Sequence, residues 1–143
     1  DFSDQFNEQK DIIRLLANEL LVNAFYHQLG EDQDRSSEII LETPVPLQLA
    51  RNESSVLLRV EDTNGGFPYE KMLASLSRGF RDKTPRQDTE GAGLGLYFVF
   101  KMTNQLILNL KENGTEIICM FDLNKRYKEY MKRVSSLHYY TGK

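Results

Sequence analysis

Apolar residues recur at helical spacing in the first part of the chain, from about Gln9 to Gln28. They are Ile12, Ile13, Leu15, Leu16, Leu20 and Phe25. No proline or glycine interrupts this segment, so the pattern predicts one long helix. The polar and acidic residues that follow, from Leu29 to Ser37, are expected to form a surface loop.

Apolar residues occupy every second position from Val56 to Val60, which is typical of a half-buried strand. Asp62 continues the same face at the point where this strand ends. The segment before it, from Ile39 to Leu49, is apolar but contains two prolines. Because proline cannot donate a backbone hydrogen bond, this segment is expected to be an edge strand or an irregular extended stretch.

The middle of the chain, from Phe67 to Glu90, has no clear period and contains glycine and proline. We expect it to form a mobile loop with short helical turns. A helix is expected to begin after the last of three closely spaced glycines and to run to about Thr103. Two strand-like runs, Leu106 to Leu110 and Thr115 to Phe121, flank an Asn-Gly pair, which favours a tight hairpin turn.

Helical spacing returns between Lys125 and Val134 and predicts a final helix. We therefore expect a single domain over residues 1–143, with a core from about 10 to 122 and a helical C-terminal extension from about 123 to 143. The order of helix, strands, loop, helix, hairpin and helix predicts an α/β two-layer sandwich. Its mostly antiparallel mixed sheet would be covered on one face by helices.

A net charge of −3 gives no electrostatic reason to expect nucleic-acid binding. The most apolar stretch, from Leu15 to Phe25, is too short to span a membrane and contains Glu19 and Asn23. The single cysteine, Cys119, cannot form an internal disulfide and is expected to pack in the core, because it lies in an apolar run. These features favour a cytoplasmic globular domain without membrane insertion.

Three polar residues, Glu19, Asn23 and His27, lie four positions apart and therefore on one stripe of the predicted helix. One interpretation is the solvent-facing side of an ordinary amphipathic helix. The other is a polar site, because a carboxylate and an amide among apolar neighbours need partners. Mg²⁺ and a triphosphate would provide them, since an amide oxygen suits a hard cation and a glutamate can take a proton from a hydroxyl or water.

Asp62 ends its strand on the inward face and is followed closely by Gly65 and Gly66. A carboxylate in that position must accept specific hydrogen bonds, and the exocyclic amino group of adenine is a suitable donor. The glycines allow a ligand to approach the backbone closely. The alternative is an ordinary Asp-Thr-Asn-Gly turn between two strands.

A second glycine cluster, Gly91-x-Gly93-x-Gly95, opens the helix that runs to about residue 103. Its backbone N–H groups and the helix dipole suit phosphate oxygens. The spacing is neither that of the dinucleotide fingerprint nor that of a Walker A loop. A basic segment with Arg81 and Lys83 precedes the cluster, so we interpret the glycines as the hinge of a lid. The alternative is that they only form turns.

Together the three segments resemble the N, G1 and G2 boxes of the GHKL ATPase superfamily, which includes sensor histidine kinases and anti-sigma-factor serine kinases. The resemblance covers roughly residues 10–122 and implies the Bergerat fold, with an ATP lid between the sheet and the helices. One departure is Asn64, which stands where the G1 box usually has its middle glycine. After glycine, asparagine is the residue that adopts a positive φ most readily.

The resemblance also implies roles for individual residues. Glu19 matches the glutamate whose carboxylate acts as general base, Asn23 the ligand of Mg²⁺, and Asp62 the adenine-binding aspartate. His27 would shape the phosphate side of the site. The remaining positions implied are Gly66, the glycine loop of Gly91, Gly93 and Gly95 with the following Leu96, Thr115 beside adenine, and Arg81 and Lys83 as lid cations that neutralise charge.

The function implied is that of the ATP-binding catalytic domain of a bacterial histidine kinase-like protein. Such a domain binds ATP with Mg²⁺ and transfers the γ-phosphate to a protein acceptor in two-component signalling. Similarity of the N box to anti-sigma-factor kinases leaves open a partner-switching serine kinase, and a nucleotide-binding regulator without transfer chemistry. The phosphoacceptor or regulatory partner would be supplied in trans or by further sequence, and a homodimer is left open. His138 is expected to be a solvated or packed tail residue.

Overall fold

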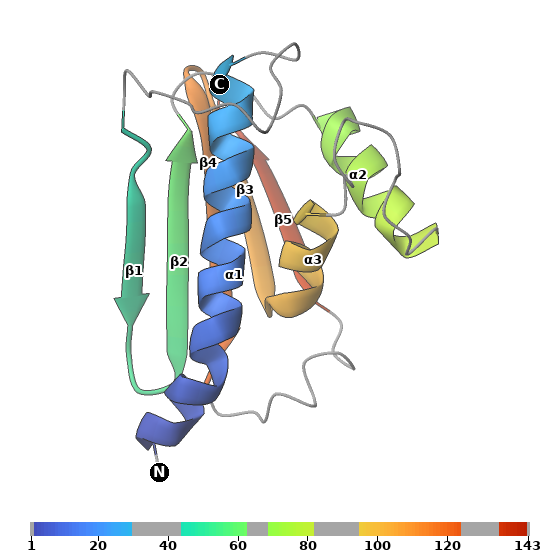
Figure 1. The fold of residues 1–143 in the computed structure, drawn as a ribbon. Helices are drawn as coiled ribbons and strands as arrows, with labels where there is room; N and C mark the ends of the chain where they lie inside the picture. Colours follow the sequence, from blue (N-terminus) through green and yellow to red (C-terminus); the bar gives the residue numbers. More distant parts are fainter. Residues whose placement is uncertain (1, 30–43, 63–68, 82–94, 124–134, 143) are drawn as a thin grey trace.

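Figure 1 shows the fold in a computed structural model, which describes residues 2–29, 44–62, 69–81, 95–123 and 135–142. Three helices and five strands lie within these ranges. The helices are α1 (Phe2–Leu29), α2 (Tyr69–Arg81) and α3 (Gly95–Met102). The strands are β1 (Leu47–Arg51), β2 (Ser55–Asp62), β3 (Gln105–Lys111), β4 (Gly114–Asp122) and β5 (Ser136–Thr141).

The strands form one sheet in the order β1-β2-β4-β3-β5. The first four in this order pair antiparallel with their neighbours, and β5 joins β3 in parallel. Within the described ranges the helices lie on one face of the sheet, with α1 across its centre and α2 and α3 toward the β3–β5 side (Figure 1). This arrangement confirms the predicted α/β two-layer sandwich with a mostly antiparallel mixed sheet.

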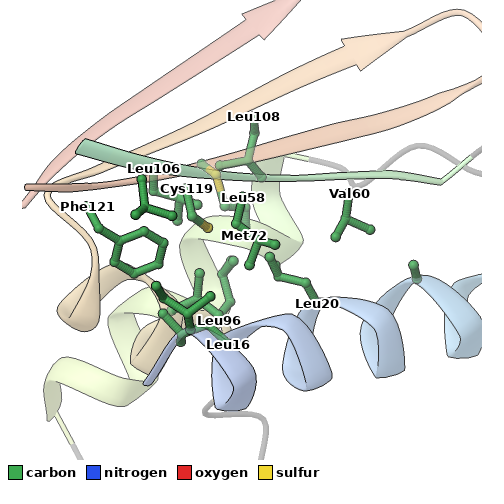
Figure 2. Packing of buried hydrophobic residues seen from close by; sticks show 14 of the residues in the cluster. Leu16, Leu20, Leu58, Val60, Met72, Leu96, Leu106, Leu108, Cys119 and Phe121 are labelled. Carbon is green, nitrogen blue, oxygen red and sulfur yellow. The ribbon is translucent and has the colours of Figure 1, made fainter. Parts of the chain in front are cut away.

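The core lies between the helices and the inner face of the sheet (Figure 2). Leu16 and Leu20 of α1 are fully buried, as are Val56 and Leu58 of β2. Each fully buried leucine contributes about 1.5–3 kcal/mol by leaving water. The alternation of the Val56 strand therefore predicted its buried face correctly. In the first helix Ile13, Leu16 and Leu20 of the apolar period are buried, whereas Leu15 is 53% exposed. The helix begins earlier than predicted, at Phe2.

The predicted hairpin and edge strand are also present. β3 and β4 form an antiparallel pair whose turn consists of Glu112 and Asn113, immediately before Gly114. Gly114 has a φ of 145°, which residues with a side chain rarely adopt. β1 lies at one edge of the sheet, and Pro44 and Pro46 precede it, so neither proline removes a ladder hydrogen bond from within the strand.

A polar network crosses the outer face of the sheet, opposite the core. Arg59 of β2 donates hydrogen bonds to Glu61 and Glu116. Lys111 Nζ lies 2.6 Å from the Glu61 Oε1 atom, and Asn109 Nδ2 donates to Glu116 Oε2 across 2.6 Å. The hydrogen bond from Asn109, with the hydrogen bond and charge of Arg59 and the charge of Lys111, holds the pKa of Glu116 below its usual value.

This polar network fixes the register of β2 and β4 next to the pair formed by Asp62 and Thr115. Glu61 pairs with Glu116 on the outer face, and the next pair, Asp62 with Thr115, faces inward. A slip of β2 by one residue would exchange the faces of Glu61 and Asp62 relative to their partners on β4. The network therefore helps to place Asp62 on the core side of the sheet.

The prediction of a mobile loop from Phe67 to Glu90 is wrong for residues 69–81, which form the regular 13-residue helix α2. Met72 and Leu76 are buried four positions apart, and Gly79 continues this stripe. A Cβ atom at Gly79 would overlap the ring of Tyr97 in α3, so the close approach of the two helices requires glycine here. The segment 82–94, which includes Lys83 and the first two glycines of the second cluster, lies outside the described residues.

The prediction of a helical extension over about residues 123–143 is wrong for residues 136–141, which form β5. Leu137 and Tyr139 pack against the core from alternate positions of this strand. His138, on the other face, is half-buried and stacks on Tyr140 with ring centroids 6.4 Å apart, so it is a packed residue. The predicted helix from Lys125 to Val134 and most of the loop predicted after α1 lie outside the described residues.

Cys119 lies in β4 and is fully buried, which confirms its predicted place in the core. Burial raises the pKa of its thiol to about 12. No helix among the described residues is long and apolar enough to cross a membrane.

We expect Gly79→Ala to destabilise the fold by about 1–3 kcal/mol, because the new methyl group must displace the Tyr97 ring at its base. The sign of the change in stability is the informative part. At a helix position with room for a side chain, a glycine-to-alanine substitution stabilises a protein by about 0.4–1 kcal/mol. The free energy of unfolding from urea denaturation measures the effect. Ala74→Gly, at an exposed position of the same helix, is the matched control and should cost only about 0.5–1 kcal/mol. A stabilised Gly79→Ala variant would contradict the close α2–α3 contact.

We expect the stability difference between the wild type and Glu116→Gln to depend on pH. The folded pKa of Glu116 lies below the ordinary value of 4.5, so the stabilising effect of its charge is present above that pH and is lost as pH falls through the folded pKa. Urea denaturation should give a difference that is largest near neutral pH and shrinks toward about pH 3. Replacing the main hydrogen-bond donor, in Asn109→Leu, should shrink the pH-dependent part. A difference that is constant with pH would contradict this role of Glu116.

Candidate functional site

Glu19 and Asn23 of α1 lie against the first residue of α3. A Cβ atom built on Gly95 would be 2.5 Å from Glu19 Oε2 and 3.5 Å from Asn23 Nδ2. Both side chains are half-buried, and their spacing of four residues places them on the same side of α1. The structure thus brings two residues of the predicted polar stripe, Glu19 and Asn23, to the last glycine of the third segment.

The sequence explains this contact locally. α1 buries Leu16 and Leu20 against the sheet, which places the neighbouring Glu19 and Asn23 at the flank of the buried stripe rather than at its centre. α3 buries Leu96 and Val99, so its first turn is held down on the core beside α1. Gly95, which precedes Leu96, therefore points no side chain into the space that the Glu19 carboxylate occupies.

Asp62, the last residue of β2, and Thr115, the second residue of β4, form a second polar pair that faces the core. Asp62 is only 7% exposed and Thr115 only 4% exposed, and the two are register partners in the sheet. The arrowhead of β2 and the C-terminal end of α1 lie at the same end of the molecule (Figure 1). Burial of a carboxylate requires hydrogen-bond partners, so this position is suited to accepting specific hydrogen bonds.

Some of the other predicted site residues are described by the structure and some are not. Leu96, in the first turn of α3, is buried. Arg81 is exposed at the end of α2, where its guanidinium donates to Ser77 Oγ with an Nη2–Oγ distance of 2.6 Å. None of the contacts described for Arg81 reaches Glu19 or Asn23. His27 belongs to α1, but its side chain lies outside the described part. Four further predicted residues lie outside the described ranges: Gly66, Lys83, Gly91 and Gly93.

Aromatic packing joins α2 to α3 on either side of residues 82–94. Phe80 makes edge contacts with Tyr97 and Phe100, with ring centroids 5.1 and 6.0 Å apart. Lys101 Nζ lies 5.9 Å from the centroid of the Phe80 ring, within the range of a cation–π contact. This aromatic cluster was not predicted from the sequence. The signal available was the presence of aromatic residues on both sides of the second glycine cluster.

Among the described residues no three His, Cys, Asp or Glu side chains gather in a way that could hold a metal ion. A cation near Asn23 would therefore need further oxygen ligands from outside these side chains. Phosphate oxygens and water are the ligands that usually complete the octahedral shell of Mg²⁺ in such sites.

Comparison with known proteins gives a family match over most of the chain. The model of the family described as histidine kinase-like ATPase domain matches residues 4–121. This range includes every described residue of the candidate site, from Glu19 to Thr115.

Curated relatives are similar at low identity over nearly the same range. The sensor protein kinase GraS of Staphylococcus aureus (strain MRSA252) is 26% identical over 131 residues, which are 88% of this chain and 34% of that protein. The sensor histidine kinase GraS of Staphylococcus haemolyticus (strain JCSC1435) is 22% identical over 129 residues, 87% of this chain and 34% of that protein. The chain thus spans about a third of the length of these relatives.

Proposed function

Because the chain belongs to the histidine kinase-like ATPase domain family, we propose that it binds ATP with Mg²⁺ and presents the γ-phosphate to a protein acceptor. The observation that carries this proposal is the packing of Glu19 and Asn23 against Gly95. This contact places a carboxylate, an amide that can bind a cation and the N-terminal glycine of a helix close together. A metal-bound triphosphate needs such groups near one another.

The described residues fit Mg²⁺ and the phosphates. Asn23 offers an amide oxygen, a ligand that hard cations prefer. The first turn of α3 offers backbone N–H groups and the positive end of the helix dipole to anionic oxygens. Gly95 keeps this turn free of a side chain where it meets Glu19. The glycines of residues 91 and 93 would extend the same surface.

Asp62 would recognise the base. Its buried carboxylate at the end of β2 would accept a hydrogen bond from the exocyclic amino group of adenine, with Thr115 beside it on β4. Guanine carries a carbonyl oxygen where adenine carries this amino group, so it would place an acceptor against an acceptor. Asp62 would therefore select adenine over guanine.

Catalysis would consist mainly of positioning and of charge neutralisation. Mg²⁺, when bound, would neutralise part of the phosphate charge. Asn23 would hold that cation, and Glu19 would accept the proton of an attacking hydroxyl or water. Arg81, at the end of α2, or Lys83, two residues further along the chain, would approach the phosphates. For Arg81 this requires release of its hydrogen bonds to Ser77.

The similarity to sensor histidine kinases favours a histidine of a protein as the acceptor. That acceptor would lie in another protein or in further sequence. A serine acceptor, as in a partner-switching regulator, is the second candidate, and the chemistry of the product distinguishes them. Phosphohistidine is lost in acid, whereas phosphoserine survives.

We expect Asp62→Asn to weaken Mg-ATP binding at least tenfold, or about 1.4 kcal/mol. The substitution keeps the size of the side chain but can turn an N–H donor toward the donor group of adenine. Isothermal titration calorimetry measures the dissociation constant. Asp122→Asn, at the opposite end of the same strand pair, is the matched control and should bind as the wild type does. Absence of binding heat for the wild type would remove the whole proposal.

We expect Glu19→Gln to reduce release or transfer of the γ-phosphate by about a hundredfold or more, because glutamine cannot accept the proton. Mg-ATP affinity should stay within about threefold of the wild type, since glutamine keeps the size and the contact with Gly95. Single-turnover assays with γ-labelled ATP and calorimetry separate the two effects. Asn23→Ala should show the reverse pattern, with the loss concentrated in Mg²⁺-dependent binding.

An unchanged rate in Glu19→Gln would exclude Glu19 as the base. Binding without measurable transfer in the wild type, even with candidate acceptor proteins present, would favour the nucleotide-binding regulator instead. Acid treatment of a labelled acceptor then distinguishes a histidine from a serine product.

A further inference from the structure

β1 forms an open edge of the sheet and carries exposed apolar side chains along it. Within the described ranges this strand pairs with β2 alone. Leu47 and Leu49 are 45% and 56% exposed. They lie opposite Val60 and Leu58 of β2, which are buried, so both leucines point to the face of the sheet that the helices cover. Apolar side chains that continue a core but remain exposed are typical of an interaction surface.

The exposure of the two leucines follows from the position of α1. This helix crosses the centre of the sheet and packs on β2, so it lies nearer to β2 and β4 than to β1 (Figure 1). Val45, just before the strand, is still partly buried against the core. The core therefore thins out along β1, where Leu47 and Leu49 form its rim.

The backbone hydrogen bonds of β1 show which of its residues face the open edge. Glu61 N donates to Pro46 O across 3.2 Å, and Asn52 N donates to Ser55 O across 3.0 Å. In an antiparallel pair, residues that bond to the neighbouring strand alternate with residues whose N–H and C=O groups point away from it. The even-numbered residues of β1 therefore bond to β2, and the two leucines direct their backbone groups toward the open edge.

The proline next to this strand does not block the edge. Proline protects an open edge when the N–H that it lacks would have pointed outward. Pro46 faces β2, as its hydrogen bond from Glu61 shows, so the missing donor is on the inner side of the pair. Leu47 and Leu49 thus keep the outward N–H groups that a further strand requires.

The edge is complementary to a second copy of itself. Leu49 is the middle residue of the strand Leu47–Arg51, and its backbone groups point outward. A two-fold axis through this position places Leu49 opposite Leu49 of the second copy, where each N–H can donate to the other C=O. The same axis places Leu47 beside the aliphatic stem of Arg51 of the second copy. The leucines of both copies then form one apolar cluster between the two helix layers.

We propose that the open edge of β1 is an interface between two copies of this chain, which pair antiparallel through their β1 strands and form one continuous sheet. This inference does not depend on the proposed function. The strand has only five residues, so its interface is smaller than the roughly 1,200–2,000 Å² of stable complexes. We therefore expect a weak dimer, with a dissociation constant of about 10–100 µM.

The proposed dimer has a consequence for the candidate sites. Because the two β1 strands run antiparallel in one sheet, both helix layers lie on the same face of that sheet. The two β2 strands then end at opposite ends of the dimer, and so do the two copies of Asp62. Neither site would be covered by the other copy.

Sedimentation equilibrium of the wild-type chain over about 5–500 µM brackets the expected dissociation constant. We expect a reversible monomer–dimer equilibrium. Leu49→Asp should raise the dissociation constant at least tenfold, because it places two carboxylates opposite each other. Ala50→Asp adds the same charge at the next position, on the outer face, and is the matched control that should stay within about threefold of the wild type.

Leu49→Pro tests the backbone pairing separately from the side chain. It removes an outward N–H and leaves the hydrogen bonds between β1 and β2 in place, so it should abolish the dimer while the monomer remains folded. Urea denaturation checks the folding of each variant. This variant also decides the question if Leu49→Asp fails to fold.

Disulfide cross-linking tests the register. In the proposed pairing, the two Cα atoms of position 49 are about 5.5 Å apart, within the range that a disulfide spans. Oxidation of Leu49→Cys by copper phenanthroline and oxygen should therefore give a covalent dimer. The two copies of position 50 would be about 8 Å apart, so Ala50→Cys should cross-link poorly. The native Cys119 is fully buried and does not compete.

The proposal is overturned if the wild type stays monomeric over this range of concentration. It is also overturned if folded Leu49→Asp and Leu49→Pro variants dimerise as the wild type does, because another surface then joins the copies. Equal cross-linking from positions 49 and 50 would exclude the proposed pairing of the two strands. None of these results bears on ATP binding, which calorimetry measures independently.

Discussion

The pairing of β2 with β4 is the constraint on which the candidate site depends. Side chains along a strand alternate between the two faces of the sheet, so this register decides that Asp62 faces the core and Glu61 the outside. The hydrogen bonds of Arg59 on the outer face and the burial of Val60 on the inner face both favour the same register. A network on the outer face thereby helps to place the carboxylate that is proposed to recognise adenine.

Glycine has a second role at the junctions between helices. Gly79 lets α2 approach Tyr97, and Gly95 lets α3 approach Glu19 of α1. α3 is thus held on both sides by contacts that a methyl group would disturb. Because its first turn is the proposed anion-binding turn, the precision of the site comes from packing around α3 as much as from the polar residues themselves.

The parts of the fold predicted correctly from the sequence are those specified by local pattern. The apolar period of α1, the alternation of β2 and the Asn113-Gly114 pair at the hairpin turn are all local patterns. α2 and β5 were missed because non-local contacts stabilise them. Packing on Tyr97 overrides the low helix propensity of Gly79, and pairing with β3 gives a strand to a segment of mixed polarity. The contact of Glu19 and Asn23 with Gly95 joins distant parts of the chain, so spacing alone could not predict it. The family resemblance predicted that these segments share one site, but not this contact.

Cys119 sits at the centre of the β4 strand, between β2 and β3, with no exposed surface and a thiol pKa of about 12. Since the thiolate is the nucleophile that reacts with thiol reagents, and the reagent needs access to the sulfur atom, this cysteine is protected on both counts while the sheet is closed. It is also the only cysteine in the chain. The rate at which such a reagent labels the native protein therefore reports how often the centre of the sheet opens, without any added probe.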